Sequence, residues 1–115
     1  MEQLPEITDE RMQARLATTR DYTLLILHTT PKTFTDEGRP IIWEHGRRNM
    51  ALEAAGLLSI VCPVTDGGEV AGIGIFDLSP EDVRQVIEGD PAVKAGVLTY
   101  ELHPARGFPG AALPG

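Results

Sequence analysis

The sequence predicts an α+β fold in which a four-stranded antiparallel sheet carries two helices on one of its faces. Three observations lead to this prediction. Four apolar segments and two helical segments follow one another in the order β-α-β-β-α-β. The chain has 115 residues, which is enough for one domain with one hydrophobic core. Right-handed crossover connections then place both helices on the same side of the sheet.

The first 21 residues are expected to form an N-terminal extension that contains a helix. Thr8 suits the N-cap position, and Asp9 and Glu10 suit the positive end of a helix dipole. The apolar face of this segment is thin, so we expect the helix to pack on a neighbour or to stay mobile.

The main domain is expected over residues 22–104 and begins with a strand, a loop and a helix. Residues 22–29 are apolar and short enough for a strand, and residues 31–40 carry the prolines and polar residues of a loop. A helix is predicted from Pro40 to about Ala55, because proline suits the first helical position and a glycine follows at the C′ position.

Three further strands are expected at residues 57–64, 70–78 and 95–103. The first two are joined by the turn Asp66-Gly67-Gly68, whose glycines accept positive φ angles at little cost. Residues 105–115 are rich in proline and glycine, which predicts an extended tail.

The second helix of the domain has a clear start and a clear end. Ser79 is a good N-cap, and Pro80 suits the first helical position. Val83 and Ile87 lie on one face, which predicts their burial. Gly89-Asp90-Pro91 ends the helix, because proline disfavours helical geometry in the residue before it.

The strands predict a second copy of the chain on the uncovered face of the sheet. An antiparallel sheet with one face in water alternates apolar and polar residues. Leu24–Leu27 and Leu57–Val61 are instead apolar with little alternation. We therefore expect a homodimer formed through this face.

Composition excludes several classes of partner. The net charge is −7, which disfavours nucleic acid and anionic membranes. The single Cys62 cannot form an intrachain disulfide, and no signal peptide or membrane span is visible, so a cytoplasmic protein is expected. Three scattered histidines give no metal-ligand spacing, and no glycine-rich nucleotide loop opens a helix, so no metal and no cofactor are expected.

The predicted topology brings one histidine and one carboxylate together. The helices run antiparallel, so the start of the first, with His45, lies beside the end of the second, with Asp90. A carboxylate that fixes an imidazole tautomer and stabilises its cation is what a general base requires. The alternative is structural, with Asp90 as a helix stop and His45 as a satisfied core residue.

Other residues are weaker candidates for the same site. His28 ends the first strand near the dyad, Arg48 lies one turn from the histidine, and Trp43 is expected near the pocket mouth, so all three are candidates for binding substrate. His28 and Arg48 also have ordinary readings, as a strand end and a solvated helix residue. Cys62 is expected in the core, and His103 at the opposite end of the domain.

Several motifs resemble the YCII-related family over about residues 22–104. That family has a helical histidine, an "aG-x-L" helix end, a "GP" dipeptide and a "DP-x-V-x-A-G" motif. The corresponding segments here are Glu44-His45, Ala55-Gly56-Leu57-Leu58, Cys62-Pro63 and Gly89-Asp90-Pro91-Ala92-Val93-Lys94-Ala95-Gly96-Val97. The resemblance implies ferredoxin-like protomers that pair into a dimeric α+β barrel, with His45 and Asp90 as the active-site dyad. One family member is a dehydrochlorinase of a chlorinated hydroxyhydroquinone.

The chain departs from the family pattern at Cys62, which replaces the glycine of "GP", in a longer loop after the first strand, and at both termini. These departures affect which substrate can be expected from the resemblance, and they leave the expected fold unchanged.

The sequence as a whole predicts a small cofactor-independent lyase or isomerase that moves a proton on a small aromatic or carbonyl-bearing compound. Two alternatives stay open: a non-catalytic dimeric ligand-binding or pathway accessory protein, and a cofactor-free oxygenase.

Overall fold

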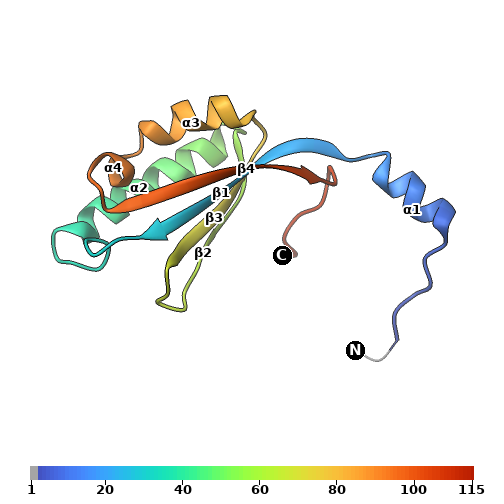
Figure 1. Ribbon diagram of the computed structural model, residues 1–115, viewed down its shortest axis with the longest axis horizontal. Coiled ribbons are helices and arrows are strands. Elements are labelled where there is room, and N and C mark those ends of the chain that lie inside the picture. Colours follow the sequence, from blue (N-terminus) through green and yellow to red (C-terminus); the bar gives the residue numbers. More distant parts are fainter. Residues whose placement is uncertain (1–2) are drawn as a thin grey trace.

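The computed structural model describes residues 3–115, and its centre is one four-stranded antiparallel sheet with helices on one face (Figure 1). The strands are ordered β2-β3-β1-β4. The elements in chain order are α1 (Asp9–Leu16), β1 (Arg20–Thr29), α2 (Gly38–Ala54), β2 (Leu58–Pro63), β3 (Val70–Phe76), α3 (Pro80–Glu88), α4 (Pro91–Lys94) and β4 (Leu98–Gly107).

This order and connectivity make a ferredoxin-like fold, which confirms the predicted fold class. β1 lies in the middle and pairs antiparallel with both β3 and β4, while β2 pairs with β3 at one edge. Both long helices, α2 and α3, follow a strand and return over the same face of the sheet (Figure 1). The extra N-terminal helix, α1, is also present.

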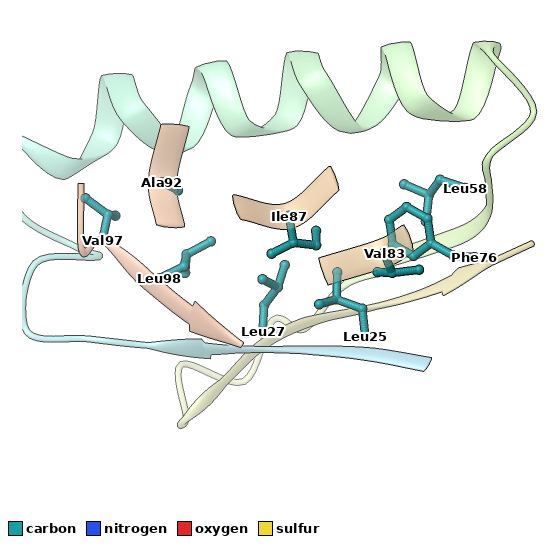
Figure 2. Close-up of a cluster of buried hydrophobic side chains, with 9 residues drawn as sticks. All are labelled: Leu25, Leu27, Leu58, Phe76, Val83, Ile87, Ala92, Val97 and Leu98. Carbon is teal, nitrogen blue, oxygen red and sulfur yellow. The ribbon is translucent and has the colours of Figure 1, made fainter. Parts of the chain in front are cut away.

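The core lies between the sheet and the helices (Figure 2). Leu25 and Leu27 of β1 point toward α3, and Phe76 of β3 is fully buried. From the helix side, Val83 and Ile87 close this layer, as their helical spacing predicts. Burial of these side chains is the main force that fixes α3 on the sheet.

α3 begins as its sequence predicts. The Ser79 hydroxyl accepts a hydrogen bond from the Asp82 N–H, and Pro80 occupies the first helical position. The helix ends at Glu88, and a separate turn, α4, follows with Asp90 as its N-cap. The prediction that the chain becomes a strand at residue 95 is therefore wrong by three residues, because the Asp-Pro pair starts a new helical turn as well as ending the old one.

β4 also extends further than predicted. Residues 104–107, assigned from the sequence mostly to the tail, pair with the first residues of β1, so that Pro104 faces Thr23 and Gly107 faces Arg20. A proline is compatible with this position because β4 is an edge strand, where one side of the backbone needs no ladder partner.

The opposite face of the sheet carries no helix. Side chains that alternate with the core residues point there, and five of them form an apolar surface across three strands. We call this surface the open sheet face; its apolar members are Leu24, Ile26, Ile60, Ile73 and Ile75. In the single chain these side chains are half-buried.

α1 stands away from the sheet at the far end of the molecule (Figure 1). None of its residues is buried. Arg15 stacks over the Phe108 ring at 4.3 Å, which links the helix to the C-terminal segment through a cation–π contact. Across residues 3–115, no helix combines the length and the apolar character needed to cross a bilayer.

Candidate active site

His45 lies on the face of α2 that turns toward the sheet. It is 9% exposed, although more than half of the residues of α2 are open to solvent. Ile42, Gly46 and Asn49 share its helix face, at the spacing that places residues one turn apart on a common stripe. This stripe forms one wall of a cavity between α2 and the sheet.

Asp90 reaches the same place from the connection between α3 and α4. It is 1% exposed. Its Oδ2 accepts hydrogen bonds from the backbone N–H groups of Ala92 and Val93, at 3.0 and 3.3 Å, and so caps α4. Its Oδ1 lies 2.8 Å from His45 Nδ1. The two oxygens therefore have separate partners, one structural and one in the site.

This geometry defines the state of the imidazole. A carboxylate can only accept hydrogen bonds, so His45 Nδ1–H is the donor to Asp90. Burial raises the pKa of the Asp90 carboxyl, but the hydrogen bond and charge of His45, with the Val93 and Ala92 N–H groups, lower it by more, so the pKa lies below its ordinary value. Asp90 is ionised at neutral pH and holds the proton of the ring on Nδ1.

The second ring nitrogen of His45 has a partner that the sequence does not predict. Asn49, one turn further along α2, donates a hydrogen bond from Nδ2 to His45 Nε2 over 3.1 Å. The i, i+4 spacing of these two residues was available from the sequence. A lone asparagine in a helix is, however, more often a solvated residue, so the spacing alone gave no reason to choose it.

The cavity beside this pair has a volume of about 250 Å³. Its floor is made by β2, β3 and their hairpin, including the backbone of Gly72. None of the described residues that line it is an Asp, Glu, Lys or Arg. Its apolar lining residues include Leu27, Phe34, Ile42, Val61, Val64, Val70, Ala71 and Leu98.

The two threonines in the cavity wall already have partners. Thr33 Oγ1 donates to the Val97 carbonyl at 2.7 Å, and Thr29 Oγ1 contacts the carbonyls of Gly68 and Glu69 at 3.3 Å. Their hydroxyls are used to hold the loop and the hairpin in place. The polar character of the cavity is therefore concentrated at the His45–Asn49 pair.

The structure does not bring the predicted substrate-binding residues to this cavity. His28 points to the open sheet face, because it alternates with Leu27, which faces the helices. Trp43 is 71% exposed and lies outside the cavity lining. Arg48 turns toward Gly89 at the end of α3, and its Nη1 is buried without a hydrogen-bond partner among the described residues.

His28 instead forms a cluster with two residues of β4. Its Nε2 lies 2.6 Å from Glu101 Oε1, and His103 Nε2 lies 2.8 Å from Glu101 Oε2. The hydrogen bonds from His28 and His103 lower the pKa of the Glu101 carboxyl.

Cys62, a half-buried free thiol, is among the residues that line the cavity floor. Within residues 3–115, no three His, Cys, Asp or Glu side chains gather in a way that could hold a metal ion.

Comparison with solved structures supports the fold. The chain is similar to 5-chloro-2-hydroxyhydroquinone dehydrochlorinase from Burkholderia phenoliruptrix AC1100, determined in complex with 2,5-dihydroxybenzoquinone. The TM-score is 0.54 at 17% sequence identity, and the similarity covers 71% of this chain and 90% of the other. No protein-family model matches the chain, and no curated protein sequence matches it. At this identity the likeness shows a shared fold.

Proposed function

We propose that this chain is a cofactor-independent catalyst of proton transfer on a small aromatic or carbonyl-bearing compound, a lyase or an isomerase. One observation carries the proposal: His45 is held by Asp90 through Nδ1, with its Nε2 on the side of an apolar cavity. An imidazole in this arrangement is suited to act as a general base, and the carboxylate stabilises the cation that forms.

The proposed reaction uses two residues. His45 Nε2 takes a proton from the bound substrate, and the electron pair of the broken bond stays on the substrate, which becomes an anion. The imidazolium is stabilised by the Asp90 carboxylate at 2.8 Å. The proton then returns to another atom of the same molecule, which is an isomerisation, or the anion expels a leaving group, which is an elimination.

The fold and the sequence motifs support the same assignment. We place the chain among YCII-related proteins, with residues 22–104 as the domain, because the motif that begins at Asp90 follows His45 in the order typical of that family. The structural neighbour with this fold is named as a dehydrochlorinase and was determined with a quinone. A phenolic or quinone-like substrate for this chain is consistent with that likeness.

We also propose that two copies pair through the open sheet face. Its isoleucines and leucine form a continuous apolar surface on three strands. Association that removes such a surface from water is favourable. A second copy presents the same surface and can meet it around a twofold axis.

A non-catalytic ligand-binding protein is the second candidate. The observation in its favour is that both ring nitrogens of His45 already have hydrogen-bond partners. In that case the dyad and Asn49 would serve only to hold α2 against α4, and a ligand would occupy the apolar cavity without reaction.

Exchange of carbon-bound hydrogen with D2O separates the two candidates. Acetophenone is a suitable probe, because it is apolar, has the size of a single ring and carries an enolisable methyl group. We expect the protein to accelerate deuterium incorporation into this methyl group and His45→Gln to reduce the rate to that of buffer. His103→Gln is the matched control, because this histidine is half-exposed and lies outside the cavity. An exchange rate in the wild type equal to that of buffer would reject the catalytic proposal.

A further inference from the structure

The carboxamide of Asn49 is hydrogen-bonded to His45 Nε2, the atom that must accept the proton in the proposed reaction. Its Nδ2 lies 3.1 Å from His45 Nε2, and both side chains line the cavity. A base whose lone pair accepts a hydrogen bond cannot accept a proton at the same time. Proton transfer therefore requires the amide to leave Nε2 and to find another acceptor in the cavity.

Among the described residues of the lining, no carboxylate and no second amide side chain is present to act as that acceptor. Thr29 and Thr33 direct their hydroxyls to backbone carbonyls, and the remaining side chains near the pair are apolar. Asn49 is half-buried, and leaving its N–H without an acceptor beneath a bound ligand has a free-energy cost. A substrate that supplies an acceptor oxygen removes this cost.

We infer that Asn49 is a substrate-binding residue that recognises a carbonyl oxygen, and that the substrate class is a neutral, one-ring-sized carbonyl compound with an acidic C–H next to the carbonyl. This inference rests on the proposed function and deepens it. When such a molecule binds, Asn49 Nδ2–H donates to the carbonyl oxygen, and Nε2 becomes free to face the neighbouring C–H.

The step is balanced in atoms and electrons. The bond from carbon to hydrogen breaks, the proton goes to His45 Nε2, and the electron pair forms a carbon–carbon double bond while the carbonyl becomes an enolate oxygen. The Asn49 amide donates to this oxygen as its negative charge grows, which is the stabilisation that such donors provide in other enzymes. Reprotonation at carbon from His45 restores the ketone.

The lining also excludes a class of ligand. No Lys or Arg is among the described residues of the cavity wall, and the Asp90 carboxylate is ionised behind His45. A carboxylate or phosphate would lose its water there without gaining a cation, which is unfavourable. The site is therefore selective for neutral molecules.

Three probes of similar shape test the inference by binding. Acetophenone has the carbonyl, ethylbenzene lacks it, and benzoate carries a negative charge. Asn49 is the single asparagine of the chain, so selective 15N-asparagine labelling gives one side-chain amide signal to follow. We expect acetophenone to shift this signal and to bind about tenfold more weakly to Asn49→Leu. Ethylbenzene should bind equally to both proteins, and benzoate to neither.

Asn49→Asp is the second variant, because it keeps the shape of the side chain and cannot donate. It should lose acetophenone affinity as Asn49→Leu does, while Met50→Leu, an exposed neighbour on α2, should not. Equal affinity of wild type and both Asn49 variants for acetophenone would overturn the inference, as would absence of acetophenone binding or preference for benzoate.

The deuterium exchange assay distinguishes a failure of the Asn49 inference from a failure of the proposed function. Exchange that depends on His45 and is unchanged in both Asn49 variants would leave the function in place and overturn the role of Asn49. Asn49-dependent binding of acetophenone without any exchange would overturn the catalytic function and leave Asn49 as the group that binds the carbonyl.

Discussion

His45 and Asp90 are 45 positions apart in the sequence, and the fold brings Nδ1 of one to 2.8 Å from Oδ1 of the other. The other oxygen of Asp90 accepts the N–H groups of Ala92 and Val93. One buried carboxylate thus holds the imidazole of α2 and the turn that leads into β4. Its substitution affects both the chemistry and the fold.

Replacement of Asp90 by asparagine is expected to move the proton on His45. An asparagine has a single oxygen, and the N–H groups of Ala92 and Val93 both require an acceptor at the same position. The amide NH2 must then face His45 Nδ1, which becomes the acceptor, and the ring proton moves to Nε2. The base is lost, and we expect the exchange rate with acetophenone to fall at least about a hundredfold.

The 15N spectrum of the imidazole measures the cause directly. In the wild type the proton should be on Nδ1, and in Asp90→Asn on Nε2. If the variant keeps the Nδ1 proton and full activity, Asp90 does not set the tautomer, and its role is confined to capping α4.

Stability in acid should depend on the same carboxyl. The pKa of Asp90 is lower in the folded chain than its ordinary value of 3.8, so its ionised form stabilises the folded state above that pH. This contribution is lost as the pH falls through the lower folded pKa. We expect the free energy of unfolding of the wild type to exceed that of Asp90→Asn at neutral pH, and the difference to shrink below about pH 4, where the Asp90 carboxylate becomes protonated. Urea titrations of both proteins measure it, and a difference that grows in acid would contradict the assignment.

Two glycines of α2 should respond oppositely to the same change. A Cβ at Gly38 would overlap the carbonyl oxygen of Lys32, so Gly38→Ala should destabilise the protein by about 1–3 kcal/mol. A Cβ at Gly46 meets no atom within 4 Å, and alanine in a helix interior is favoured over glycine by about 0.5–1 kcal/mol. Urea denaturation of the two variants should therefore give shifts of opposite sign. Equal shifts would show that the loop before α2 does not pack as described.

The open sheet face should control the oligomeric state. Ile75→Lys places a charge in the middle of this apolar surface, and burial of an unpaired charge is strongly unfavourable. We expect sedimentation equilibrium to give a dimer for the wild type and a dissociation constant at least about a hundredfold higher for the variant. Met50→Lys adds the same charge at an exposed position on α2 and should remain dimeric. A wild type that sediments as a monomer would exclude the dimer.

Much of the fold could be predicted because its elements begin and end with strong local signals. Ser79 and Pro80 start α3, and glycine ends α2, because these residues satisfy or release backbone groups whatever their surroundings. The errors lie where tertiary structure decides. Pro104 is compatible with a strand only because β4 is at the edge of the sheet, and the sequence does not state which strand is at an edge.

The site was predictable to the extent that topology determines it. The proximity of His45 and Asp90 follows from the antiparallel arrangement of α2 and α3, although Asp90 is the N-cap of α4 and not the last residue of α3. The sequence predicts the correct end of the strand for His28 but not its face, because both faces of β1 are apolar and the alternation gives no direction; in the structure the side chain lies on the face away from the cavity. Asn49 could not be predicted as a site residue, because its contact with His45 Nε2 depends on the orientation of the His45 ring, which only the structure provides.

Two walls of the cavity come from separate segments of the chain and have different roles. His45 and Asn49 lie on the α2 wall, with Asp90 behind His45, whereas much of the opposite wall is the β2–β3 hairpin at the edge of the sheet. Changes in hairpin length or sequence can therefore reshape the space offered to a substrate while the proton-carrying groups keep their distances. A fold divided in this way can acquire new substrates without rebuilding its chemistry, since the hairpin and the residues that carry the proton lie in separate segments of the chain.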